Sequence, residues 1–236
     1  MAFTVHAVMP GVWHIVDCMG VCMTLLEGEN AAMLVDTGYG IEDVADFMRH
    51  MTDLPLTVFL THNHHDHAMG ARCFPETYML EADMADWRMF TNDEMRRRVL
   101  TQAIGKNLPV DEKTFLAGEI PLPKVMKPGV IDLGGLTAEI IEAPGHTPGS
   151  AVVYVPERKL LLSGDDWNPC TWLFFPQALG LREYRSNMRG IQQLPFEKVL
   201  CPHREALYDR WMFDDFFNAL TAVSYTHLRA HETLRH

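Results

Sequence analysis

Short apolar runs separated by turn residues predict that the chain begins with β-strands. Within residues 4–36, runs of four or five residues are rich in β-branched and apolar side chains, and turn residues such as Pro10-Gly11 separate them. The expected strands are residues 4–8, 12–16, 23–26 and 32–35. The last of these strands ends at Asp36, which Thr37 and Gly38 follow.

A different spacing, with apolar residues three or four positions apart, predicts helices. In residues 41–51 it places Ile41, Val44 and Met48 on one side. The expected helices are residues 41–51, 81–100, 181–194 and 205–222, the third weakened by Gly190. Residues 105–130 contain four prolines and three glycines, so we expect a loop or lid-like connector there.

The remaining apolar runs predict six further strands, at residues 56–60, 130–133, 138–142, 151–155, 160–162 and 196–200. The order is strands, helix, strand, helix, strands, helix, strand, helix, with no internal repeat of 20–50 residues. This order predicts an α/β fold in which two sheets pack together with helices outside, a four-layer αββα sandwich.

Composition limits the kind of protein. A chain of 236 residues with 47% hydrophobic residues can form one large domain or at most two small ones. A net charge of −11 argues against a surface that binds nucleic acid, which needs clustered Lys and Arg. We interpret the basic run Arg96-Arg97-Arg98 as a solvated helix face rather than a phosphate site. A small-molecule substrate is the partner we expect.

Location can also be predicted from the sequence. No apolar stretch approaches the ~20 residues that cross a bilayer, and the N-terminus lacks a basic segment followed by an apolar core. We therefore predict no membrane association and no signal peptide. Five cysteines, an odd number without CxxC spacing, fit a reduced, cytoplasmic setting.

The last fourteen residues differ in character from the rest. Residues 223–236 contain three histidines and two arginines but one acid, and residues 224–233 resemble a translated sequencing adapter. We interpret residues 223–236 as a non-native tail and assign residues 1–222 to the domain. The oligomeric state is left open.

The densest polar cluster lies at residues 62–67, where four histidines and a carboxylate follow the apolar stretch 54–60. Histidine is the commonest metal ligand, and carboxylates also suit Zn²⁺ and similar ions. On an extended segment, alternation places His62 and His64 on one side. A turn after His64 would direct Asp66 and His67 toward a second ion. A solvated His-rich loop would show the same local pattern.

Three other strand ends carry polar residues that could complete such a site. His146 lies in a Gly/Pro turn after an apolar strand, Asp165 follows residues 160–162, and His203 follows Cys201-Pro202. Each is a weak signal alone. Four polar strand ends in this order are hard to explain by chance, so together they favour a metal centre over a solvated loop.

With its H-x-H-x-D-H motif, the chain resembles the metallo-β-lactamase-fold hydrolase superfamily over roughly residues 4–220. The resemblance implies two metal ions, with Asp36 placed behind the ligands and orienting them. Asp165 would bridge the two ions, and its neighbour Asp166 could compete for this bridging role. The implied ligands are His62, His64 and His146 for one ion, Asp66, His67 and His203 for the other, and Asp165 as a bridge between them.

A two-metal centre explains the expected chemistry. A bound metal lowers the pKa of water from 15.7 to about 7, and a pair of ions can hold the resulting hydroxide and polarise the substrate oxygen. We expect two Zn²⁺, with Mn²⁺ or Fe²⁺ as alternatives. Asp66 is also the expected catalytic residue, which orients the hydroxide or accepts a proton. His65 occupies a variable position of the motif and is expected to be exposed or to support a ligand.

The substrate is the least determined part, because this fold hosts many activities. Lactonases of the superfamily often place Tyr three residues after the bridging Asp, where this chain has Asn168. Several aromatic and Met side chains, among them Phe90, Trp172, Phe174 and Phe175, either line an apolar mouth or pack in the core. We expect a hydrolase of a small ester, thioester or lactone. The alternatives are a β-lactam or phosphodiester hydrolase, an iron-dependent oxidoreductase, or a noncatalytic binding module.

Overall fold

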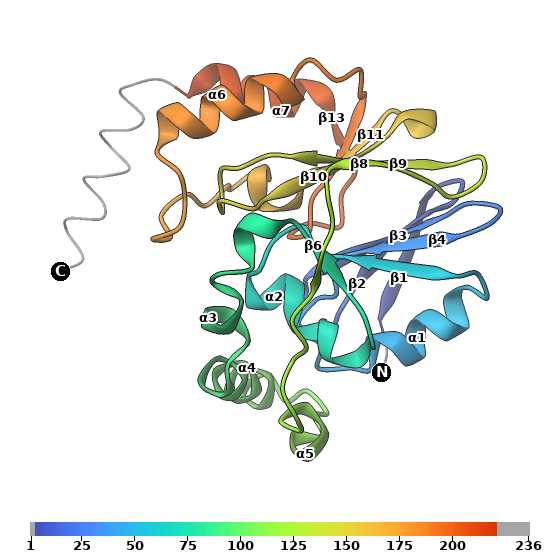
Figure 1. Ribbon diagram of the computed structural model, residues 1–236, viewed down its shortest axis with the longest axis vertical. Coiled ribbons are helices and arrows are strands. Elements are labelled where there is room, and N and C mark those ends of the chain that lie inside the picture. Colours follow the sequence, from blue (N-terminus) through green and yellow to red (C-terminus); the bar gives the residue numbers. More distant parts are fainter. Residues whose placement is uncertain (1–2, 221–236) are drawn as a thin grey trace.

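The computed structural model describes residues 3–220, which form two facing β-sheets with helices on their outer faces (Figure 1). This arrangement confirms the predicted αββα sandwich. The first sheet has the strand order β1 (Thr4–Met9), β2 (Val12–Val16), β3 (Cys22–Glu27), β4 (Ala32–Val35), β5 (Leu56–Phe59), β6 (Tyr78–Met79) and β7 (Lys124–Val125). β1 to β4 pair antiparallel, whereas β4 to β7 pair parallel.

The second sheet contains the C-terminal strands. Its order is β13 (Tyr208–Asp209), β12 (Lys198–Leu200), β11 (Leu160–Leu162), β10 (Ala151–Val155), β9 (Thr137–Glu142) and β8 (Gly129–Asp132). β11 and β12 are parallel, and the other neighbours are antiparallel. Each sheet therefore contains parallel neighbours whose carboxyl ends lie at the same edge, where polar loops can meet.

The main core lies between the two sheets, and each outer face has its own helical cover. Met33, Val35 and Phe59 of the first sheet pack against Val153 and Leu162 of the second. The first sheet is covered by α1 (Val44–Met51), and the second by α6 (Leu181–Ile191) and α7 (Arg210–Ala219) (Figure 1). Because β10 and β11 are buried on both faces, their sequences are continuous apolar runs.

A helical subdomain follows β5 and supports the His-rich loop. It contains α2 (His65–Ala68), α3 (Trp87–Thr91), α4 (Asp93–Gly105) and α5 (Glu112–Phe115). The prediction of one helix over residues 81–100 was wrong, since Asn92 is extended and separates α3 from α4. Its side chain accepts a hydrogen bond from Met95 N at 2.9 Å and so caps α4.

Arg96 of α4 does not lie on a solvated face, contrary to our interpretation of the basic run. Its side chain is buried and donates hydrogen bonds to the carbonyl groups of Phe115, Ala117 and Gly118. These bonds fix the turn after α5 against α4. The predicted connector 105–130 is therefore partly ordered into α5 and β7, and Arg97 and Arg98 remain exposed.

Two smaller predictions also changed. The helix expected over residues 205–222 begins at Arg210, because Tyr208 and Asp209 pair with β12 as β13. The strands β6, β7 and β13 are two residues long, too short for an apolar pattern to reveal them. The predicted tail, residues 223–236, lies outside the described residues.

In residues 3–220 the five cysteines are unpaired. None of the helices in this part of the chain is long and apolar enough to cross a membrane. The cytoplasmic location stays a prediction.

Candidate metal centre

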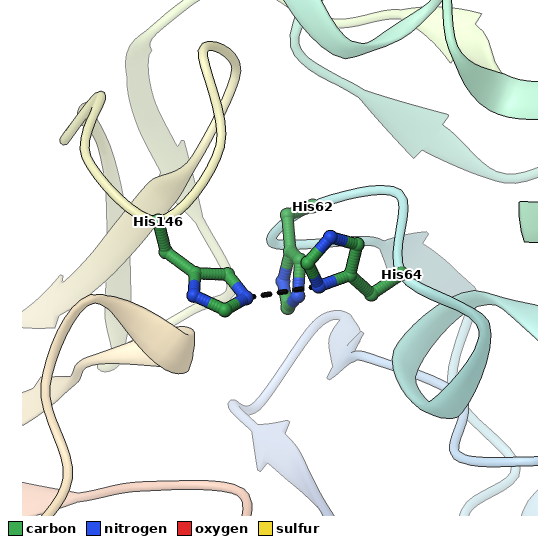
Figure 2. A group of neighbouring side chains, drawn as sticks. All are labelled: His62, His64 and His146. Carbon is green, nitrogen blue, oxygen red and sulfur yellow. Dashed lines mark hydrogen bonds between the residues drawn. The ribbon is translucent and has the colours of Figure 1, made fainter. Parts of the chain in front are cut away.

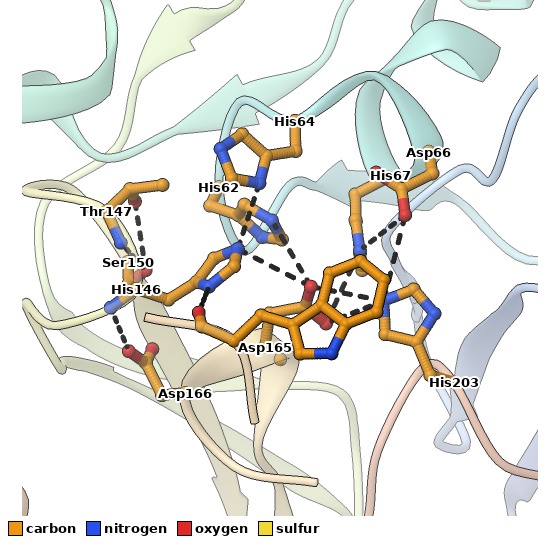
Figure 3. A network of polar contacts seen from close by, with 12 residues as sticks. His62, His64, Asp66, His67, His146, Thr147, Ser150, Asp165, Asp166 and His203 are labelled. Carbon is orange, nitrogen blue, oxygen red and sulfur yellow. Dashed lines mark hydrogen bonds and ion pairs between the residues drawn. The ribbon is translucent and has the colours of Figure 1, made fainter. Parts of the chain in front are cut away.

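The structure brings all seven predicted ligand residues to one edge of the sandwich (Figure 3). The His-rich loop follows β5, and His146 lies in the turn between β9 and β10. Asp165 follows β11, and His203 follows β12. Because the sheets face each other, the loops at the carboxyl ends of their parallel strands meet above the core.

Three histidines form the first group, which Figure 2 shows with their rings converging. Single ligand atoms of His62, His64 and His146 lie within 4.8 Å of one another. His64 Nδ1 is 2.9 Å from His146 Nε2. His146 Nδ1 donates to the carbonyl oxygen of Trp172 at 2.7 Å, which leaves a lone pair on its Nε2. The first group therefore presents nitrogen lone pairs to one point.

The second group consists of Asp66, His67 and His203, with Asp165 placed between the two groups (Figure 3). His67 Nε2 is 3.6 Å from Asp66 Oδ2 and 3.5 Å from Asp165 Oδ1. His203 Nε2 lies 3.1 Å from Asp165 and 3.7 Å from Asp66. On the other side, Asp165 Oδ2 is 3.5 Å from His146 Nε2. Asp165 thus faces both groups.

Asp36 orients the ring of His67 from behind. Its Oδ2 accepts a hydrogen bond from His67 Nδ1 at 3.0 Å, so that Nε2 faces Asp66 and Asp165. Thr61 donates its hydroxyl proton to Asp36 and therefore accepts from His62 Nδ1 at 3.0 Å. One carboxylate thus fixes ligand residues of both groups. Asp36 itself has a φ of 65°, which Asp tolerates better than most residues.

Charges and burial set the protonation states within the centre. Burial, together with neighbouring His67, lowers the pKa of His62 well below its usual value, and burial beside His146 lowers that of His64 to about 3. Burial also lowers the pKa of His67, but the carboxylates of Asp165, Asp66 and Asp36 outweigh it and raise that pKa. The neutral form of His62 and His64 is the form that binds metals.

The two adjacent aspartates have opposite environments. Burial raises the pKa of Asp165, but His67 and His203 outweigh it and hold that pKa well below the usual value. Burial raises the pKa of Asp166 well above its usual value. Asp166 points away from the ligand cluster and accepts a hydrogen bond from the backbone N–H of His146 at 2.9 Å. Asp166 therefore supports the His146 turn, whereas Asp165 lies between the two groups.

His65, at a variable position of the motif, lies beside the ligand groups. Its ring packs edge-on against Tyr39 at 5.5 Å, and its Nδ1 is 3.8 Å from Asp66 Oδ1. It belongs to none of the potential metal-binding groups found among the described residues.

Asp83 is a supporting residue that sequence analysis missed. Its buried carboxylate accepts hydrogen bonds from Asn63 N, Thr147 Oγ1 and Gly149 N, at 3.1, 2.8 and 2.6 Å. Asn63 lies between two ligands of the first group, and Thr147 follows the third. A Cβ added at Gly149 would lie 2.5 Å from Asp83 N, so only Gly allows this approach. No local pattern marked Asp83, because the contact joins segments 64 residues apart.

The donor set fits a pair of metal ions. Buried His62 Nε2 and His67 Nε2 have no hydrogen-bond partner, which is costly unless another group binds them. Ligand atoms around a tetrahedral Zn²⁺ are about 3.4 Å apart, given Zn–N and Zn–O bonds of about 2.1 Å. The 3.5–3.9 Å separations from Asp165 to His62, His67 and His146 are close to this value. Mixed nitrogen and oxygen ligands suit Zn²⁺, Mn²⁺ or Fe²⁺.

Comparison with known families decides the relationship of the chain. Residues 16–203 match the model of the metallo-beta-lactamase superfamily. The chain belongs to this superfamily. The match includes all seven candidate ligands and most strands of both sheets.

The chain is also similar to individual proteins, one in sequence and others in structure. Acyl-coenzyme A thioesterase MBLAC2 of Gallus gallus is 26% identical over 200 residues, covering 76% of this chain and 70% of its own. A metallo-beta-lactamase from Pontibacter korlensis has a TM-score of 0.65 at 18% identity, covering 92% of this chain and 97% of its own. FIM-1 of Pseudomonas aeruginosa, solved in a mono-zinc form, has a TM-score of 0.64 at 17% identity, with 91% and 92% covered.

A further solved structure shows another metal on this fold. TTHA1623, solved in a di-iron-bound form, has a TM-score of 0.58 at 22% identity, covering 84% of this chain and 94% of its own. At these identities the solved structures establish the fold of the chain and not its substrate.

Proposed function

We propose that the protein hydrolyses acyl thioesters at a dinuclear metal centre formed by His62, His64, Asp66, His67, His146, Asp165 and His203. Membership of the superfamily, with its curated thioesterase relative, assigns the chain to the metal-dependent hydrolases. The observation that carries the proposal is the convergence of two ligand groups on the shared carboxylate of Asp165.

The residues of the centre account for the steps of thioester hydrolysis. When bound, a pair of metal ions activates water and polarises the carbonyl oxygen. His67 Nε2 and Asp66 would help to hold the ions, and Asp66 Oδ2 would accept the proton of the water as its oxygen attacks the acyl carbon. The carbon–sulfur bond then breaks, and the sulfur leaves with its electron pair as a thiolate. A thiol pKa near 8.5 makes that departure easy without a separate proton donor.

The region after Asp165 does not favour a lactone. Asn168, where related lactonases often have Tyr, is buried, and its Oδ1 accepts a hydrogen bond from Cys170 N at 2.7 Å. The side chain therefore stabilises its own turn.

A substrate panel combined with metal analysis tests the proposal. We expect close to two metal ions per chain by elemental analysis, with Zn²⁺ the favoured metal and Mn²⁺ or Fe²⁺ the alternatives. Among thioester, lactone, β-lactam and phosphodiester substrates, we expect the highest kcat/KM for a thioester, measured by thiol release. Higher turnover of another class would contradict the substrate assignment. One ion or fewer after metal-replete expression would contradict the dinuclear centre.

A further inference from the structure

An apolar rim of four aromatic residues borders the first histidine group. It consists of Phe90, Trp172, Phe174 and Phe175. The Phe90 ring lies 4.5 Å from the His64 ring, and the Phe175 ring lies 4.9 Å from His64 and 5.5 Å from His146. From Phe175 the rim continues to Phe174 at 4.9 Å and Trp172 at 6.4 Å. The apolar surface is thus continuous with the metal centre.

The outer rim is open to solvent, unlike neighbouring aromatic residues of the same segments. Trp172 and Phe174 are 52% and 56% exposed, whereas Trp87 and Trp167 are fully buried. Residues 167–181 contain no charged residue and no His, in a chain with 22% charged residues. Such a clustered apolar surface beside a polar site is typical of a ligand-binding surface.

The backbone of this segment is fixed to the metal centre. The carbonyl oxygen of Trp172 accepts the hydrogen bond from His146 Nδ1 at 2.7 Å, and Leu179 N donates to Gly145 O at 2.8 Å. On the opposite side, Gln177 Nε2 approaches Met89 Sδ of α3 at 3.5 Å. The exposed rings therefore have a defined position relative to the ligands rather than belonging to a detached loop.

We propose that this rim binds the aliphatic acyl chain of the substrate, with the reacting carbonyl at the metal centre. The inference rests on the proposed thioester hydrolysis and adds which part of the thioester the protein recognises. An acyl chain fits because it is uncharged and because one end must reach His64 and His146 while the rest extends over Phe175 toward Trp172. A charged head group would find no partner among residues 167–181.

A series of thioesters with acyl groups of increasing length tests this proposal. With one fixed thiol, kcat/KM should rise by about two- to fourfold for each added methylene from acetyl upward until the rim is covered. Phe174→Ala and Trp172→Ala should reduce the dodecanoyl to acetyl ratio of kcat/KM by about 3- to 10-fold each. The matched control is Trp211→Ala on α7, which is 61% exposed and distant from the rim in sequence, and should keep the ratio. Equal losses for both acyl lengths would overturn the proposal.

Two further arms separate the possible outcomes. Varying the thiol with a fixed acyl group should change kcat/KM less than varying the acyl group; the opposite result would mean that the rim binds the leaving group. Calorimetric titration with sodium dodecanoate should show weaker binding to Phe174→Ala than to Trp211→Ala, and equal binding would contradict the rim. If no thioester is hydrolysed at any length, the proposed function fails. Hydrolysis whose kcat/KM does not depend on acyl-chain length would refute acyl-chain binding by the rim but not the proposed function. The same conclusion would follow if Phe174→Ala abolished a self-association of the protein and left the chain-length dependence unchanged.

Discussion

The two ligand groups of the centre differ in how completely the protein surrounds them. The side chain of His62 in the first group is 1% exposed, whereas that of His203 in the second group is 29% exposed. The first group has four supports: Asp83 contacts its loops, Asp166 holds the His146 turn, the Trp172 carbonyl contacts His146, and Asp36 reaches His62 through Thr61. The second group depends mainly on Asp36, and His203 contacts Asp165 and Asp66 without a backing carboxylate of its own in the described chain.

This difference predicts a tight first site and a weaker, more accessible second site. Preorganised ligands lose little conformational entropy when an ion binds, whereas the partly exposed side chain of His203 must first be ordered. Solvent also reaches the second group directly, so the attacking water is expected to enter there. Because Asp165 contacts both groups, a substitution at Asp165 should affect both sites at once.

Asp165→Asn should have the largest effect. It removes the charge shared by both groups, so we expect loss of both ions and a fall in kcat of about 10³–10⁴-fold, the upper part of the range for a positioned catalytic group. Asp166→Asn is the matched control, since Asn can still accept the hydrogen bond from His146 N and should retain most activity. Elemental analysis and kcat for the two variants check this. A more severe loss in Asp166→Asn would exchange their roles.

Asp66→Asn should affect the second group alone. The amide keeps the size but loses the charge and the proton-accepting oxygen, so kcat/KM should fall about 10²–10³-fold while one ion remains bound. His65→Ala, one residue away, should have much less effect because His65 lies outside the ligand groups. Thermal unfolding of both variants should stay close to that of the parent protein. Near-equal losses of kcat/KM would mean that the second group is assigned wrongly.

Asp36→Asn and Asp83→Asn should lower the affinity of different ions, because the two carboxylates support mainly different ligand groups. Loss of a carboxylate behind a ligand typically lowers metal affinity about 10–100-fold. We expect Asp36→Asn to weaken the second ion more than the first, because Asp36 contacts His67 directly and reaches His62 only through Thr61. Asp83→Asn should weaken mainly the first ion, because Asp83 fixes the loops of His62, His64 and His146. Competition with a chromophoric chelator measures each affinity. The same pattern in both variants would show that the supports act on the centre as a whole.

The smallest effect is a difference between the two sites of the unaltered protein. Stepwise titration with a chelator should remove the ions in two phases, with the second-group ion leaving at the lower chelator concentration. His203→Ala should abolish the first-released phase and leave the other. Loss of both ions in a single phase from the unaltered protein would contradict the inequality of the sites.

The long strands and their order were predictable because each is a run of apolar residues bounded by turn residues. Residues 12–16, 32–35, 151–155 and 160–162 were predicted with the bounds that the structure has. The helical subdomain was less predictable. A single Asn92 with an extended backbone divides the predicted helix, and the buried Arg96 resembles its exposed neighbours in sequence. Its burial depends on three carbonyl groups about twenty residues away.

The sequence by itself determined the family, the sandwich and the identity of the candidate ligands, because the H-x-H-x-D-H motif and the strand-end residues are local features. Only the tertiary structure decided how these side chains are oriented and supported. Asp83 and the Trp172 carbonyl, which the sequence did not mark, act across 20 and 26 residues of sequence. The exposure of Trp172 and the burial of Trp167 are also set by packing. Contacts of this kind depend on which loops the two sheets bring together, and the spacing of residues along the chain does not encode that.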